Sequence, residues 1–306
     1  MPEPATAPSD DVVQPFRLGP SGTDGPGIGG RIVRLGPLVD DIIRRHDYPE
    51  PVARLVAEAL ALTAVLASAL KFDGVFTLQI QGDGPVSLLV VDATSSGEMR
   101  AYAKVKTLPE AKTGAPVPAL LGRGHLAFTV DQGPETERYQ RIVELNGDSL
   151  ADCAQHYFRQ TEDLDAAILL TAGRSHGDGW RAGALFLQRL PKEEGRVLAS
   201  DDADDPWRRA MLLLATVAES EMLDPNLDLL LLLYRLFHED GARVTPPRPL
   251  KRGCRCSRER IGEVLKLLPR AELEDLKIDG RLEVTCEFCN QTECFDDREI
   301  EALFAG

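Results

Sequence analysis

The cysteines near the C-terminal end of the chain have the types and the spacing of a metal site. Cys254 and Cys256 form a C-x-C pair, and Cys286 and Cys289 form a C-x-x-C pair, with 29 residues between the two pairs. Two close pairs, separated by enough chain to fold back, are typical of a tetrahedral zinc site in which each pair supplies two thiolates. Four soft thiolates without a carboxylate favour zinc, with an iron–sulfur cluster as the alternative. The sequence therefore predicts one Zn²⁺ per chain.

Such a site has two chemical interpretations. As a static clip, zinc would fold a segment of about 55 residues whose core is too small to be stable alone. As a redox switch, its thiolates would be attacked by oxidants, and disulfide formation would expel the metal. The tight C-x-C pair favours a switch because its sulfurs can reach each other, although the resulting ring is strained. The spacing alone leaves both interpretations open.

The charge of the chain argues against a nucleic-acid role. Residues 252–306 carry 9 Lys and Arg against 13 Asp and Glu, and the whole chain has a formal charge of −14. A nucleic-acid reader needs a basic face, and an acidic chain is a poor ligand for polyanions. Neither nucleic acid nor an anionic membrane surface is therefore expected as a partner.

The sequence also lacks the signals of export and of common enzyme families. Its N-terminal segment has neither a basic nor an apolar region, so it does not resemble a secretory signal. No stretch reaches the roughly 20 consecutive apolar residues of a membrane span. The chain contains no Gly-Lys pair, which removes a P-loop, and no hydrolase or kinase motif. We expect a cytoplasmic protein that is not an enzyme, whose cysteines are metal ligands, redox sensors or buried thiols.

The residues before the cysteines alternate between two periodicities. Alternating apolar residues between Gly-rich turns predict antiparallel strands, and apolar residues at i, i+3 and i+4 predict helices. Strands are expected at 12–18, 31–35, 75–81, 86–92, 99–105, 125–131, 138–145, 166–172 and 180–190, and helices at 37–46, 51–70 and 149–160. Hairpins with inserted helices indicate an α+β domain with a mainly antiparallel sheet.

The composition changes after Leu190. Residues 191–205 are acidic and nearly devoid of large apolar side chains, as in a linker, and helices are expected at 206–219 and 226–237. We therefore expect three parts. These are an N-terminal α+β domain (1–190, with 1–10 disordered), an acidic linker with apolar helices (191–251) and a small zinc-binding module (252–306).

The cysteine motif and its surroundings resemble the redox-regulated 33-kDa heat-shock chaperone family, the 33 kDa chaperonins. The motif is present as GCRCSRER…VTCEFCN. Four further blocks are similar to this family: YRLFHEDGARVTPPRPLKRGCRCS, RRHDYPEPVARLVAEALALTAVLASALKFDGVFTLQIQGDGPVSLLV, GHLAFTVDQG and SLADCAQHYFRQTED. The resemblance extends from about Gln14 to Phe295, nearly the whole chain.

The resemblance implies an ATP-independent holdase that is inactive when it is reduced and zinc-bound. In the family, oxidation closes each cysteine pair on itself, which here means Cys254–Cys256 and Cys286–Cys289. Zinc then leaves, the C-terminal module unfolds, the linker region becomes unstable and apolar surface is exposed to unfolded client proteins. The reduced form is expected to be a monomer and the oxidised form a homodimer.

One apolar run is a candidate for the client-binding surface: Leu229, Leu230, Leu231, Leu232 and Leu233. A helix that is apolar all round is usually buried. We expect this run to be buried in the reduced protein and partly exposed in the oxidised one.

Two cysteines lie outside the four-thiol motif, and one alternative function is open. Cys294 lies outside the four-thiol motif and is expected to be a free thiol near the start of a helix, with a role as competing ligand as the alternative. Cys153 is expected to be a buried thiol. The alternative to a chaperone is a zinc-containing thiol oxidoreductase that acts through Cys286 and Cys289, although this pair does not open a helix in a βαβ context.

Overall fold

The computed structural model describes residues 10–19, 27–106, 114–133, 136, 138–162, 164–174, 179–190 and 205–304. The chain forms two compact units, Met1–Arg252 and Gly253–Gly306. Of the segments expected to be disordered or to form the acidic linker, residues 1–9 and 191–204 lie outside the described residues.

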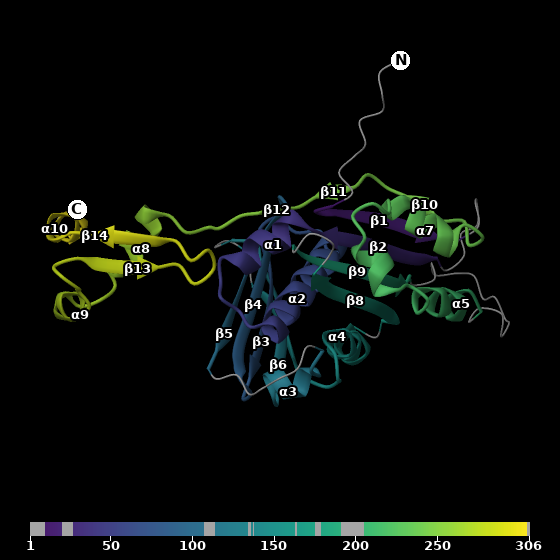
Figure 1. Ribbon diagram of the computed structural model, residues 1–306, viewed down its shortest axis with the longest axis horizontal. Helices are drawn as coiled ribbons and strands as arrows, with labels where there is room; N and C mark the ends of the chain where they lie inside the picture. Colours follow the sequence, from purple (N-terminus) through teal and green to yellow (C-terminus); the bar gives the residue numbers. More distant parts are fainter. Residues whose placement is uncertain are drawn as a thin grey trace, which may run out of the picture. The chain divides into compact units, whose positions relative to one another are not determined.

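The first unit contains two sheets, each with six strands among the described residues (Figure 1). Sheet A has the order β10-β1-β2-β9-β8, with β11 also paired to β1, and all its pairs are antiparallel. Its strands are β1 (Val12–Leu18), β2 (Ile28–Leu35), β8 (Ala166–Arg174), β9 (Trp180–Arg189), β10 (Arg243–Val244) and β11 (Arg248–Pro249). The α+β class with mainly antiparallel sheets is confirmed.

Sheet B has the order β12-β5-β4-β3-β6-β7. Its strands are β3 (Val75–Gly82), β4 (Val86–Thr94), β5 (Glu98–Val105), β6 (Gly124–Asp131), β7 (Tyr139–Glu144) and β12 (Lys251–Arg252). All pairs are antiparallel except that of β12 with β5. Alternation along β3, where Phe76, Leu78 and Ile80 are buried, directs one face of this sheet to the core.

The helix α2 (Glu50–Ala69) packs against strands of both sheets, including β9, β8 and β4. Helix α1 (Pro37–Arg44) precedes it. By length and composition α2 is apolar enough to cross a membrane. The apolar residues of α2 are interrupted by Arg54 and Glu58, so the helix does not have the roughly 20 consecutive apolar residues of a membrane span. Because 78% of the apolar window is buried inside the unit, the position of α2 in the core accounts for its apolar character.

Two further helical segments lie beside sheet B and β8: α3 (Val117–Leu121), which the sequence did not predict, and α4 (Leu150–Tyr157). Ser149 caps α4 as an N-cap should, since its Oγ accepts a hydrogen bond from the Asp152 N–H at 3.1 Å. The last turn, Phe158–Glu162, winds into a π-helix, so that the expected helix continues in a different form.

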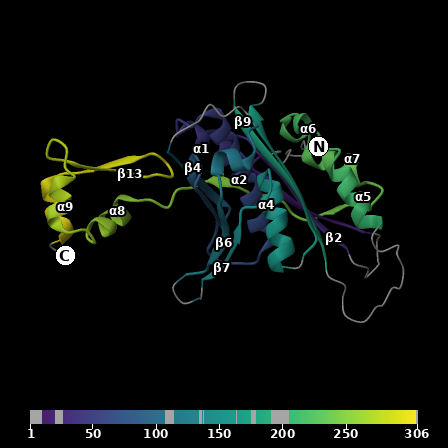
Figure 2. The same ribbon diagram turned by 90° about the horizontal axis from the view of Figure 1, so that it is seen from below.

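Three helices cover the face of sheet A that is opposite to α2 (Figure 2). They are α5 (Asp205–Leu214), α6 (Glu219–Leu223) and α7 (Leu229–Phe237), and we call them the cap. The predicted helix 206–219 thus ends at Leu214, and the helix predicted to begin at 226 begins at Leu229. Asp228 determines that start because its Oδ1 accepts hydrogen bonds from the N–H groups of Leu230 at 2.6 Å and Leu231 at 3.2 Å.

The cap is held on sheet A by a continuous apolar layer. Phe16 of β1 stacks on Phe237 of α7, with ring centroids 5.8 Å apart. Its ring lies over Gly30 of β2, where a Cβ atom would come within 2.1 Å of it. Glycine at this position therefore makes room for the aromatic ring that anchors α7.

An extended segment, residues 243–252, follows the cap. It pairs with β1 through β10 and β11, and then with β5 through β12, so it runs from one edge of sheet A to one edge of sheet B. Lys251 and Glu98 form an ion pair at 3.0 Å. The chain enters the second unit directly after Arg252.

The second unit contains α8 (Arg258–Leu265), α9 (Arg270–Asp275), the hairpin of β13 (Leu282–Thr285) and β14 (Thr292–Phe295), and α10 (Asp297–Phe304). Its core is a small cluster of buried side chains: Leu265, Leu273, Leu282, Phe295 and Ile300.

Candidate metal centre

Two tight turns of the second unit carry the four predicted ligands. Cys254 and Cys256 lie just before α8, whose N-cap Ser257 accepts a hydrogen bond from the Arg260 N–H at 3.2 Å. Cys286 and Cys289 lie in the turn between β13 and β14. The N–H of Cys286 donates to the Gln291 carbonyl at 2.9 Å, which closes that turn.

The second turn returns through a left-handed residue. Asn290 has a φ of 56°, and its N–H donates to the Cys286 carbonyl at 2.8 Å. Asparagine tolerates this conformation better than most residues with a side chain. The turn thereby directs both of its thiols to the same side as the C-x-C pair.

The four sulfur atoms lie within 4.8 Å of one another. The Sγ atoms of Cys254 and Cys286 are 3.7 Å apart, and those of Cys256 and Cys289 are 3.4 Å apart. In a tetrahedral site with Zn–S bonds of about 2.3 Å, the sulfurs are separated by about 3.8 Å. The spacing is too long for disulfides, which need about 2.05 Å. The cluster is therefore compatible with zinc.

The thiols differ in acidity when no cation is considered. Burial raises the pKa of Cys254, but hydrogen bonds from the Cys256 backbone and from the neighbouring thiols outweigh it and bring that pKa down to about 7. Burial raises the pKa of Cys289, and burial together with the other thiols raises that of Cys256. The Cys254 thiolate therefore forms readily, whereas Cys256 and Cys289 resist ionisation. A cation at the centre would remove this resistance.

Arg258 joins the helical part of the unit to the hairpin. Its guanidinium donates to Glu293 at 2.9 Å, to Glu299 at 2.7 Å and to the Cys294 carbonyl at 2.8 Å, and it lies 4.2 Å from the centroid of the Phe295 ring. Arg258 was not among the residues predicted for the site. Its position directly after the N-cap of α8 was the only available signal, and such a signal is weak.

Two cysteines are not among the four clustered thiols. Cys294 is a free, exposed thiol in β14, three residues before α10 begins at Asp297, as expected for a free thiol near the start of a helix. Its Sγ lies 3.9 Å from a carboxylate oxygen of Glu283. Cys153 is 1% exposed, as expected, and burial raises its pKa to about 11.

The five leucines of α7 divide between two environments. Leu229, Leu232 and Leu233 are buried against sheet A, whereas Leu230 and Leu231 are 47% and 45% exposed. The expectation that the whole run is buried was wrong for these two residues. A helix that packs on one side buries positions i, i+3 and i+4 and leaves i+1 and i+2 facing outward.

The family model described as Hsp33 protein matches residues 22–296. The chain belongs to the Hsp33 family. Among curated relatives, the 33 kDa chaperonin of Caulobacter vibrioides NA1000 is 39% identical over 297 residues, which is 94% of this chain and 95% of that protein. The 33 kDa chaperonin of Azotobacter vinelandii is 39% identical over 281 residues, or 91% of each chain.

A solved structure shares the Hsp33 fold of this chain. The Hsp33 homologue from Thermotoga maritima matches with a TM-score of 0.80 and 24% identity, over 96% of this chain and 98% of that one. At this identity the match shows the fold alone. The oxidoreductase alternative gains no support from the Hsp33 relationship, and Cys286–Cys289 lies in a β-hairpin turn rather than at the start of a helix.

Proposed function

We propose that this chain is a redox-regulated, ATP-independent holdase chaperone of the cytoplasm that binds unfolded client proteins. The observation that carries the proposal is the cluster of four free thiols in a unit with a very small core. Membership of the Hsp33 chaperone family supports the general function. The ligands of one zinc ion would be Cys254, Cys256, Cys286 and Cys289.

When bound, zinc would supply a link between the two cysteine turns and much of the folding free energy of the unit, roughly 10–16 kcal/mol in small modules. The ion pairs of Arg258 join α8 to the hairpin further along the unit, and they are partly exposed, so each contributes little.

The proposed switch is the oxidation of the two pairs, Cys254–Cys256 and Cys286–Cys289. Each pair loses two electrons and two protons and forms one S–S bond, while a peroxide molecule takes up both and becomes two molecules of water. The sulfurs then no longer offer thiolates for a metal. Because S–S bonds of about 2.05 Å are shorter than every sulfur separation in the cluster, the turns must rearrange.

The surface proposed to bind clients is the apolar layer between the cap and sheet A, with Leu229–Leu233 on its helical side. The extended segment 243–252 leads from the cap to the start of the second unit, and it is held on β1 and β5 by short pairings of two residues each. Loss of order after Arg252 would weaken those pairings first. Exposed apolar surface of this extent is rare in soluble monomers and is suited to binding unfolded chains. We also propose a monomer when reduced and a homodimer when oxidised.

The test is a light-scattering assay of a heat-denatured client. It compares reduced, zinc-loaded protein with protein treated with peroxide at elevated temperature, both without ATP. We expect suppression of aggregation by the oxidised protein at about one chain per client and no suppression by the reduced protein. Catalytic turnover at substoichiometric amounts would instead favour the oxidoreductase, and equal activity in both states would exclude the switch.

A further inference from the structure

Arg34 lies buried near the C-terminal end of β2. Arg34 is 0% exposed and has Val33 and Leu35 as its neighbours in the strand. Side chains alternate along a strand, and Ile28 and Ile32, which share its parity, belong to the apolar layer beneath the cap. Arg34 therefore points to the cap side of sheet A, where a buried charge requires close partners.

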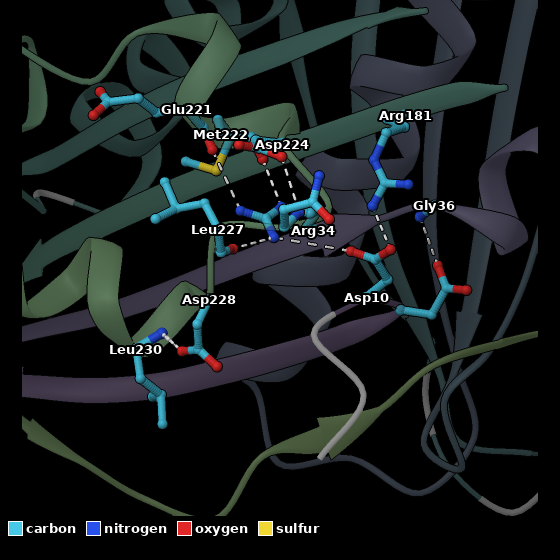
Figure 3. A network of polar contacts seen from close by, with 12 residues as sticks. Asp10, Arg34, Gly36, Arg181, Glu221, Met222, Asp224, Leu227, Asp228 and Leu230 are labelled. Atoms are coloured by element: carbon cyan, nitrogen blue, oxygen red, sulfur yellow. Dashed lines mark hydrogen bonds and ion pairs between the residues drawn. The ribbon is translucent and has the colours of Figure 1, made fainter. Parts of the chain in front are cut away.

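Its partners are backbone carbonyls of the cap (Figure 3). Nε donates to Met222 O at 2.7 Å, Nη1 to Leu227 O at 2.6 Å and Nη2 to Glu221 O at 3.3 Å. These carbonyls belong to α6 and to the turn that joins α6 to α7. One side chain of the sheet thus binds the part of the cap where two helices meet, 187 to 193 residues away in the sequence.

The charges around Arg34 come from the sheet side and from the cap. Asp10 lies 4.0 Å from Nη1 and also forms an ion pair with Arg181 of β9. Asp224 and Asp228 of the cap attract the guanidinium, and Arg181 repels it. Asp228 is also the N-cap of α7. The electrostatic partners of Arg34 therefore include the residue that starts the leucine helix.

The second contact that seats α6 is steric. Met222 lies on Gly183 of β9, where an added Cβ atom would come within 2.2 Å of Met222 Cγ and 2.9 Å of its Sδ. A third contact is the ion pair of Arg54 with Glu219 at 2.6 Å. Glu219 is half exposed in this pair, so it contributes less.

The surroundings of Arg34 would change if α6 were lifted from sheet A. With the cap in place, the guanidinium is desolvated but makes three charged hydrogen bonds. With α6 lifted, water replaces these carbonyls as the partner. The hydrogen bonds therefore stabilise the closed cap specifically, while the favourable hydration of an exposed charge keeps the open state within reach.

We propose that Arg34 is the positioning residue that latches the cap to sheet A and thereby sets how readily the apolar layer beneath α6 and α7 is uncovered. The expected effect on client binding rests on the proposed holdase function, whereas the contact of Arg34 with the cap is a property of the fold. The partner that gains access is an extended, apolar segment of an unfolded protein.

The test uses the full-length, reduced, zinc-loaded protein and two variants that each loosen α6 from sheet A, one through its hydrogen bonds and one through its packing. Arg34→Met removes the hydrogen bonds and leaves three carbonyls unpaired, and Gly183→Ala pushes Met222 away without a change of charge. Arg34→Lys keeps the charge but has a single donor group, so it should retain part of the protection of 219–237 that Arg34→Met loses. The matched control is Arg31→Met, on the same strand and the opposite face, because the Nε of Arg31 makes no hydrogen bond within the described part of the chain.

Hydrogen exchange measures the latch, and client light scattering measures its consequence. We expect amides of 219–237 to exchange about 100-fold faster in Arg34→Met and in Gly183→Ala, with β3–β5 and the zinc content unchanged and with wild-type behaviour in Arg31→Met. Unchanged exchange of 219–237 in both variants would overturn the latch. If Arg34→Met also loses protection in β3–β5, the first unit as a whole is destabilised, and the exchange of 219–237 in Gly183→Ala then tests the latch.

The two proposals can fail separately. Suppression of client aggregation by the reduced Arg34→Met protein, without oxidant and with zinc retained, supports both the latch and the client surface. Faster exchange of the cap without any such suppression keeps the latch and overturns the apolar layer as the client surface.

Discussion

Removal of zinc from the reduced protein should unfold the second unit and leave the first unit folded. The perturbation is a strong zinc chelator in the presence of a thiol reductant, so that no disulfide can form. This arrangement separates the loss of the metal from oxidation. It tests the four thiols as the structural centre of residues 253–306.

The expected magnitude follows from the size of the core. The second unit has five buried apolar side chains in its cluster, whereas the core of the first unit extends over α2 and both sheets. Structural zinc contributes roughly 10–16 kcal/mol, and whole domains are stable by about 5–15 kcal/mol. The metal therefore accounts for at least as much free energy as a unit of this kind has in total.

The assay is hydrogen exchange resolved by peptide, before and after chelation. Amides of α8 and of the β13–β14 hairpin should exchange at rates within about tenfold of an unfolded chain, while those of β3–β5 keep their protection. Zinc added back in excess should restore the protection, which serves as the control for reversible unfolding. Retained protection of the hairpin in metal-free, reduced protein would refute the reasoning, because the unit would then be stable without its centre.

The remaining predictions concern single residues. Cys256→Ser should abolish stoichiometric zinc binding, whereas Cys294→Ser and Cys153→Ser should keep one zinc per chain; loss of zinc in Cys294→Ser would show that the fourth ligand is wrongly assigned. Peptide mapping of the oxidised protein should find Cys254–Cys256 and Cys286–Cys289, and a Cys254–Cys286 bond would contradict the proposed pairing. Leu232→Ala should lower the stability of the cap by about 2–5 kcal/mol, and Leu230→Ala should cost much less because Leu230 is half exposed. Burial raises the pKa of Cys153 from 9.0 to about 11, so the unfolded chain loses this proton first as the pH rises. The free energy of unfolding of the first unit should therefore fall between pH 9 and pH 11, by roughly 2–3 kcal/mol more than in Cys153→Ala, as measured by denaturant titration.

Patterns within short windows were enough to predict most of the strands and the chemistry of the cysteines. Alternation of apolar residues predicted β3, β4 and β5 almost to their ends, because a strand with one buried face has a period of two in its own sequence. The two cysteine pairs predicted a cluster because each tight turn brings its own two thiols together. The start of α4 after its N-cap Ser149 was predicted for the same reason, since an N-cap is a local interaction.

The sequence by itself thus determined the α+β class, the hairpins and the identity of the clustered thiols, all of which depend on neighbours a few residues apart. Only the tertiary structure decided which leucines of α7 are buried, because the answer depends on the face that meets sheet A. It also decided that Arg34 is buried at the cap, although Arg17 and Arg31 occur in similar strand sequences. The carbonyls that satisfy Arg34 lie 187 to 193 residues further along the chain. No local pattern encodes such a contact, since burial of a charge becomes favourable only when the folded chain supplies its hydrogen-bond partners.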